Sequence, residues 1–167
     1  MNTLVKLSDR LSDLVANISA VILGLMTVLI LVEIFIWNLF EKTTLIADEY
    51  SAYGLAAIIF MGAGYCLKEK GHIRITLVLG FLPAKLASTI TFIATLIATV
   101  FMGYLWWYLF LMVKSAIRYE STSGTLTNTP LWIPQTVMLV GAGCFFIQLA
   151  ATTLKTWQAI ATGEEVV

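Results

Sequence analysis

The sequence predicts an all-α membrane protein with four transmembrane helices and a short amphipathic interfacial helix between the second and the third. Apolar residues make up 59% of its 167 residues and charged residues only 12%, whereas soluble domains carry about 25% charged residues. The apolar residues gather in four long runs, and a helix needs about 20 such residues to cross a hydrocarbon layer of about 30 Å. We therefore expect a single membrane domain over residues 1–167.

The first predicted span covers residues 14–40 and is interrupted only by Glu33. This run is longer than the apolar core of a signal peptide, which has about 7–15 residues, and no small-residue cleavage site ends it. We expect it to be retained as a helix. The second span covers residues 46–67. Both spans must be helical because backbone groups in lipid have to be paired within their own segment.

A shorter apolar segment, residues 72–83, separates the second span from the third. It is too short to cross the membrane, and a lone strand there would leave its edge without hydrogen bonds. We predict an interfacial helix that ends at Pro83. The third span covers residues 86–113 and the fourth residues 131–157. Their extra length predicts tilting or protrusion from the bilayer, and Pro134 suits the first turn of the fourth helix.

The distribution of basic residues predicts that both termini are cytoplasmic, because short cytoplasmic loops carry most of the Lys and Arg. With four spans, the side of the termini holds Lys6, Arg10, Lys68, Lys70, Arg74, Lys85 and Lys155, and the other side holds Lys42, Lys114 and Arg118. Five aromatic residues gather near that second side, as an interfacial belt should: Trp37, Trp106, Trp107, Tyr108 and Trp132.

The segment Lys68-Glu69-Lys70-Gly71-His72-Ile73-Arg74 concentrates charge between apolar runs and marks the inner membrane surface. Anionic lipids attract such cations. We expect the following residues to anchor the chain at this surface: Lys68, Lys70, His72, Arg74 and Lys85. A haem inside a membrane bundle needs axial ligands there, often two histidines. The sequence has one histidine and no CxxC motif, which argues against a redox subunit, and it lacks the residue spacing of a metal site.

Glu33 is the only acidic residue well inside an apolar run. A carboxylate at membrane depth costs several kcal/mol, so such a residue is a candidate for function. One interpretation is a carboxylate near the outer interface, paired with Lys114, with Arg118 or with a hydroxyl of another helix. Others are a proton or ion relay and a contact with a partner protein. The sequence leaves these interpretations open.

Small residues in the second and fourth spans, Gly62-Ala63-Gly64 and Gly141-Ala142-Gly143, predict close helix packing. The packing would lie either inside the four-helix unit or against another membrane protein. Cys66 and Cys144 fit small core residues. The third and fourth spans hold few polar groups, which makes a poor route for a polar solute and a suitable scaffold. Zero net charge argues against nucleic-acid binding, and the sequence has no P-loop or nucleophile motif, so we expect no enzymatic activity.

Four motifs, in this order, carry a resemblance to a known family: Ala47-Asp48-Glu49-Tyr50-Ser51, Gly62-Ala63-Gly64-Tyr65, Gly71-His72-Ile73-Arg74 and Thr129-Pro130-Leu131-Trp132-Ile133-Pro134-Gln135. With these motifs, its length, its four spans and its predicted topology, the chain resembles the small membrane subunit (Q-type, DctQ-like) of tripartite ATP-independent periplasmic (TRAP) transporters. The likeness covers essentially the whole chain.

The resemblance implies sodium-driven uptake of an organic acid, of the C4-dicarboxylate or sialic acid type, across the bacterial inner membrane. The implied partners are a large M-type membrane subunit, which would hold the sodium ions, a periplasmic P-type substrate-binding protein, and membrane phospholipids. The small subunit would hold no cofactor, would act as a scaffold for the large one, and would have docking of the P-type protein as a further role. The candidate partner contacts are Glu33, Asp48, Glu49, Gly62, Gly64, Trp132 and Pro134.

An alternative from a different class is a small self-contained proton-coupled exporter that works as an oligomer around Glu33. Such exporters have four spans and a membrane glutamate in the first. The long loop of residues 119–130 and the position of Glu33 toward the outer end of its span favour the scaffold over this alternative.

Overall fold

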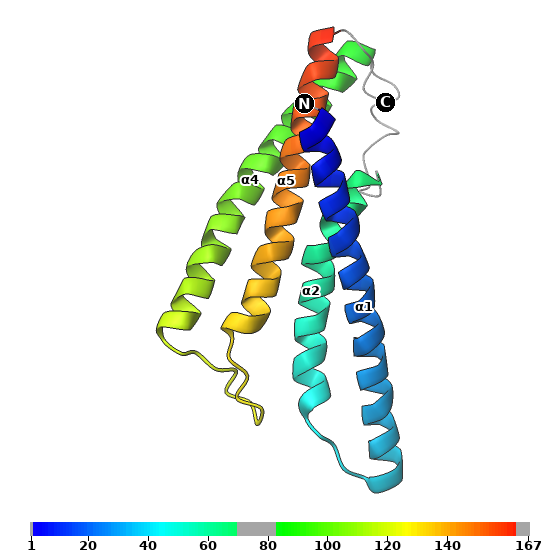
Figure 1. The fold of residues 1–167 in the computed structure, drawn as a ribbon, viewed down its shortest axis with the longest axis vertical. Helices are drawn as coiled ribbons and strands as arrows, with labels where there is room; N and C mark the ends of the chain where they lie inside the picture. The colour runs from blue at the N-terminus through cyan, green and yellow to red at the C-terminus, as the bar shows by residue number, and fades with distance from the viewer. Residues whose placement is uncertain (1, 70–82, 163–167) are drawn as a thin grey trace.

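The computed structural model describes residues 2–69 and 83–162. It contains four long helices: α1 (Asn2–Phe40), α2 (Ile46–Lys68), α4 (Ala84–Arg118) and α5 (Trp132–Thr162) (Figure 1). All four are long and apolar enough to cross a membrane, which confirms the prediction of an all-helical protein with four spans. The predicted interfacial helix at residues 72–83 lies outside the described residues, apart from Pro83.

Helix ends agree with the local sequence. Pro83 has the φ of −55° that its ring imposes, and its carbonyl accepts the amides of Leu86 and Ala87 at 2.9 and 3.1 Å to open α4. Pro134 lies in the first turn of α5, where a missing N–H costs little. A single antiparallel bridge between Thr122 and Pro130 is the β-type pairing within the described residues.

The four helices form an open row rather than a closed bundle. Helix α1 packs on α2, α2 packs on α5, and α5 packs on α4, with a smaller contact between α1 and α5. Among the described helices, α4 has extensive contact with α5 alone. Figure 1 shows the start of α1 near the last turns of α5 at one end, called the terminal end here. The α1–α2 and α4–α5 connections lie at the opposite end, the loop end.

The buried core is thin. One apolar cluster, Leu67, Met102, Leu109, Ala142 and Leu149, joins α2, α4 and α5, and a smaller one, Val15, Ala57 and Met61, joins α1 and α2. Only 6% of the most apolar window of α1 is buried, and 33% of that of α5. Exposed apolar area costs about 25 cal/mol per Å² in water, so these surfaces must face lipid or another protein.

A glycine allows a very close contact between α5 and α2. A Cβ atom at Gly141 would lie 2.8 Å from the backbone carbon of Phe60 and 2.9 Å from the backbone nitrogen of Met61. The backbones of α5 and α2 therefore approach each other in a way that a side chain at this position would prevent. The small-residue motif of the fourth span thus serves packing inside the unit.

Candidate functional site

Polar groups gather at the terminal end and at the loop end. Glu33 is at the centre of one cluster at the loop end. It lies two turns before the end of α1. Its carboxylate accepts hydrogen bonds from the hydroxyls of Thr43 and Thr44 and, at 2.8 Å, from the backbone amide of Thr44. The loop that it holds begins and ends with left-handed residues, Glu41 at φ 52° and Leu45 at φ 57°. Such a backbone is unfavourable for L-residues, and the Glu33 clasp stabilises it.

These contacts correct one expectation for Glu33. Within the described structure it forms no ion pair with Lys114 or Arg118, and its hydroxyl partners come from the α1–α2 loop, not from another helix. The reason is geometric. The loop comprises only residues 41–45, so the hydroxyl and amide donors of the loop reach the Glu33 carboxylate. Helix α4, which carries Lys114 and Arg118, lies at the opposite edge of the row from α1.

Glu49 organises a second cluster at the loop end. Its carboxylate, in the first turn of α2, accepts hydrogen bonds from the hydroxyls of Thr125 and Thr127 and from Tyr53 at 2.9 Å. The α4–α5 loop is thereby tied across to α2. Its own backbone is paired as well, because the amide of Ser123 donates to the Thr129 carbonyl at 3.0 Å. The loop is therefore a folded surface feature held in a defined place.

An open depression of about 710 Å³ lies beside this clasp, with Leu45, Asp48, Glu49 and Leu126 among its lining residues. Asp48 is exposed, and it forms no hydrogen bond or ion pair with the described residues. Leu126 is 78% exposed at the loop tip. This combination of an available carboxylate and exposed apolar side chains is suited to contact with another protein.

The terminal end holds a buried polar network that the sequence reasoning missed. Gln148 of α5 is only 1% exposed. Its side-chain oxygen accepts hydrogen bonds from Ser8 and, at 3.2 Å, from Ser12, both buried on α1. Its amide nitrogen donates to Asp9 at 3.0 Å, and Asp9 lies 3.9 Å from Lys155. The spacing of four residues between the serines is the signal that could have revealed this polar face.

Lys68, predicted as a lipid anchor, forms ion pairs at the same end. Its ammonium group lies 2.5 Å from the Asp13 carboxylate of α1 and 3.5 Å from Glu69. Lys68 therefore also links α2 to α1. Three other predicted anchors, Lys70, His72 and Arg74, lie outside the described residues, as does the side chain of Lys85.

The predicted partner contacts fall into two groups. Those exposed at the loop end are Asp48 and Trp132, and Pro134 beside them is half-buried. The glycines of α2 face inward: a Cβ at Gly64 would lie 3.4 Å from the Ser12 hydroxyl, and one at Gly62 would lie 3.7 Å from the Ser19 hydroxyl. The carboxylates of Glu33 and Glu49 are engaged in the clasps. The structure thus brings the acidic candidates to one end and separates the glycines from them.

The chemistry available is that of hydrogen bonding and ion pairing. In the described part of the chain, His, Cys, Asp and Glu residues form no group of three that could hold a metal ion. Cys66 and Cys144 are both free thiols. Nearly all the polar side chains described above connect one helix, or its loop, to another.

Four spanning helices, a thin core and broad apolar faces define a multi-pass membrane protein. A family model, described as the DctQ component of tripartite ATP-independent periplasmic transporters, matches residues 26–159. The chain belongs to this family, the small membrane component of TRAP transporters, which confirms the resemblance seen in its motifs. No curated protein and no solved structure matches the chain. The matched region includes Glu33, Glu49 and Gln148 and begins after the Ser8 and Ser12 side of the network.

Proposed function

We propose that the chain is the non-catalytic scaffold subunit of a TRAP transporter in the bacterial inner membrane, with both termini cytoplasmic. It binds the large M-type subunit, which takes up an organic acid of the C4-dicarboxylate or sialic acid type and binds the sodium ions that drive uptake. Family membership supports the transporter assignment, and the arrangement of the helices supports the scaffold role.

The free face of α1 is the observation that carries this proposal. Exposed apolar side chains surround most of α1. One set of them recurs at alternating spacings of four and three residues, which is a repeat by which helices pack against each other. They are Leu14, Ile18, Val21, Leu25, Val28, Val32, Phe35 and Leu39. Beside this stripe, a Cβ at Gly24 would meet nothing within 4 Å, so a partner helix could approach α1 closely there.

The use of the buried polar groups supports a scaffold over a transport path. Both polar atoms of the Gln148 side chain are engaged, by Ser8, Ser12 and Asp9, and the Thr99 and Thr153 hydroxyls pair with each other at 2.9 Å between α4 and α5. Polar groups on a solute route would have to face a cavity instead. The engagement of Glu33 by its own loop likewise favours a structural brace over the proton relay of a self-contained exporter.

We further propose that the depression at the loop end contributes to docking of the periplasmic P-type protein. Asp48 supplies an unpaired charge and Leu126 an exposed apolar tip. The Glu49 clasp holds the loop that presents them. Pre-organisation of this kind lowers the entropy lost on binding.

A pair of matched variants tests the scaffold role. Gly24→Leu fills the open space on α1, whereas Ala94→Leu places the same side chain at an exposed position of α4. In co-expression with the large subunit, we expect Gly24→Leu to reduce co-purification and sodium-driven uptake in proteoliposomes, and Ala94→Leu to leave both unchanged. The proposal fails if this chain alone transports the solute in liposomes, or if the two variants behave alike.

A further inference from the structure

The open face of α4 carries a layered pattern that the proposed function does not use. Exposed residues recur at alternating spacings of three and four along the side of α4 that faces away from the other described helices. Aliphatic Ile97 and Val100 are followed by aromatic Tyr104 and Trp107, then by Leu111. Continuing the same spacing leads to Lys114 and Arg118, both exposed. Apart from Leu111, the order from aliphatic to aromatic to cationic follows the profile of one bilayer leaflet.

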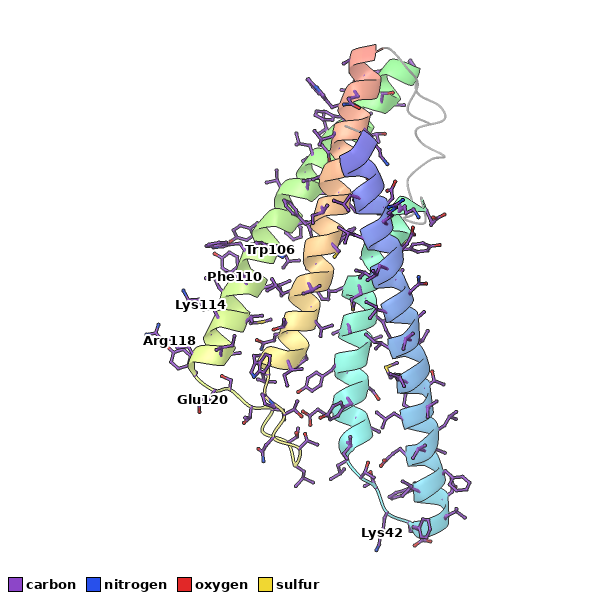
Figure 2. The ribbon with its side chains drawn as sticks, in the orientation of Figure 1. Lys42, Trp106, Phe110, Lys114, Arg118 and Glu120 are labelled. Atoms are coloured by element: carbon purple, nitrogen blue, oxygen red, sulfur yellow. The ribbon has the colours of Figure 1, made fainter. Side chains whose placement is uncertain are left out.

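Lys114 and Arg118 have no acidic partner in the described structure. The ion pairs found there involve Lys68 and Lys155 only. The Arg118 guanidinium lies 5.9 Å from the ring of its neighbour Tyr119, and Figure 2 shows the Lys114 and Arg118 side chains on the side of α4 that faces away from α5. Because Lys114 lies within an apolar spanning helix, its charge needs a counter-ion near the membrane.

The depth of the two cations matches that of lipid phosphates. Aromatic side chains such as Tyr104 and Trp107 settle at the headgroup boundary. Lys114 is seven residues beyond Trp107 on α4, which is about 10 Å at 1.5 Å per residue. Side chains of a helix lean toward its N-terminus, so the long Lys and Arg side chains reach back toward the boundary. The headgroup layer is about 5–8 Å thick on each side. The Lys114 charge falls into it, and Arg118, about 6 Å further along the helix, reaches back toward its outer edge.

We propose that Lys114 and Arg118 bind the phosphate group of a phospholipid in the leaflet at the loop end. The acyl chains would lie along Tyr104, Val100 and Ile97, on the hydrocarbon side of Trp107. The two residues are one turn apart, about 6 Å along the helix, so both can contact a single phosphate. Arg118 offers paired N–H donors that match phosphate oxygens, and Lys114 adds a compact point charge. Two cations favour a lipid of net negative charge, such as phosphatidylglycerol.

This inference goes beyond the scaffold role, and it assigns the two edges of the row different neighbours. The free stripe of α1 stays apolar as far as Leu39 and passes the open Gly24, whereas the stripe of α4 ends in unpaired cations. Charge complementarity therefore points to lipid at α4. The lipid test does not need the large subunit, so its outcome is independent of the transporter assignment.

The test uses the full-length chain, purified in mild detergent, with native mass spectrometry to count bound lipids. Phosphatidylglycerol is titrated against wild type, a Lys114→Gln/Arg118→Gln double variant and a Lys42→Gln control. Lys42 is also an exposed cation of the loop end but belongs to the α1–α2 loop (Figure 2). Each cation near a lipid surface contributes about fivefold in affinity, so the double variant should bind about 30-fold more weakly. The control should bind like wild type.

Three further measurements complete the design. Thermal unfolding of the double variant checks that it folds, and a Lys114→Arg/Arg118→Lys swap should retain most of the binding. Inorganic phosphate should not displace the lipid at equal concentration, because it lacks the acyl chains. Equal lipid affinity of the double variant and the control would overturn the proposal. So would displacement of the lipid by inorganic phosphate.

Discussion

Replacing Gln148 by Leu tests whether the buried polar network, and not the thin apolar core, holds α1 against α5. Gln148 makes three side-chain hydrogen bonds and is 1% exposed. Leu has a similar volume, so the change removes the hydrogen bonds without opening a cavity. Ser8 and Ser12, both at most 3% exposed, would lose their acceptor.

The magnitude follows from the three bonds. The two bonds from neutral hydroxyls are worth about 0.6–1.5 kcal/mol each, and the bond to the Asp9 carboxylate about 1.5 kcal/mol. The apolar gain from Leu offsets about 1 kcal/mol. We expect the free energy of unfolding to fall by about 2 kcal/mol, and the unfolding temperature by about 4–8 °C. Thermal unfolding in detergent, followed by tryptophan fluorescence, measures this shift.

Two further variants test the Gln148 prediction. In a triple variant, Ser8→Ala and Ser12→Ala accompany Gln148→Leu. It should recover at least half of the loss, because replacing both partners of a hydrogen bond costs little. The matched control is Gln135→Leu in the same helix: the Gln135 side-chain oxygen is buried without a partner in the described structure, so its removal should not lower the unfolding temperature. If Gln148→Leu unfolds like wild type, or the triple variant is no better than the single, the network does not hold these helices.

Two other predictions concern the loop end. Glu33→Ala should release the α1–α2 loop and speed trypsin cleavage after the exposed Lys42 severalfold. Glu33→Gln should have a smaller effect because its side chain keeps a hydrogen-bond acceptor. Unchanged cleavage of Glu33→Ala would show that the Glu33 hydrogen bonds do not order the loop. Glu49→Ala should raise hydrogen–deuterium exchange of the amides in residues 121–131. The neighbouring Asp48→Ala should not, and equal exchange in the two variants would contradict the role of Glu49.

The helices could be predicted from the sequence because membrane crossing has a simple compositional requirement. Apolar runs of sufficient length predicted all four helices, and the positions of Pro83 and Pro134 agree with the starts of α4 and α5. The bounds were less predictable, because α1 begins at Asn2, in a polar segment. That segment is helical because Ser8, Ser12 and Asp9 find partners on α5, a tertiary contact with little signal in composition.

The partners of the acidic residues could be predicted only in part. The sequence placed Glu33 near an interface with a polar partner, but it could not decide between distant cations and nearby hydroxyls. That choice depends on the order of the helices across the row, with α1 and α4 at opposite edges. The same order decides that Gly64 faces Ser12 within the unit and that Gly24 faces outward. Helix order is a property of packing, which the hydropathy of single segments does not contain.

A row of helices with little core suits the proposed role of a subunit that lies between lipid and a larger protein. Apolar burial separates few of its residues from the surroundings, and in lipid apolar contact alone gives helices little reason to associate. The remaining cohesion comes from close backbone contact at Gly141, from the Thr99–Thr153 pair and from polar links at both ends, with Gln148 and Lys68 at one and Glu49 at the other. Because these links lie near the ends or on the inner sides of the helices, the outer faces of α1 and α4 stay free to meet other surfaces. Loss of these links should therefore separate the helices from one another and leave their outer apolar faces unchanged. We expect such variants to lower the stability of the protein and its assembly.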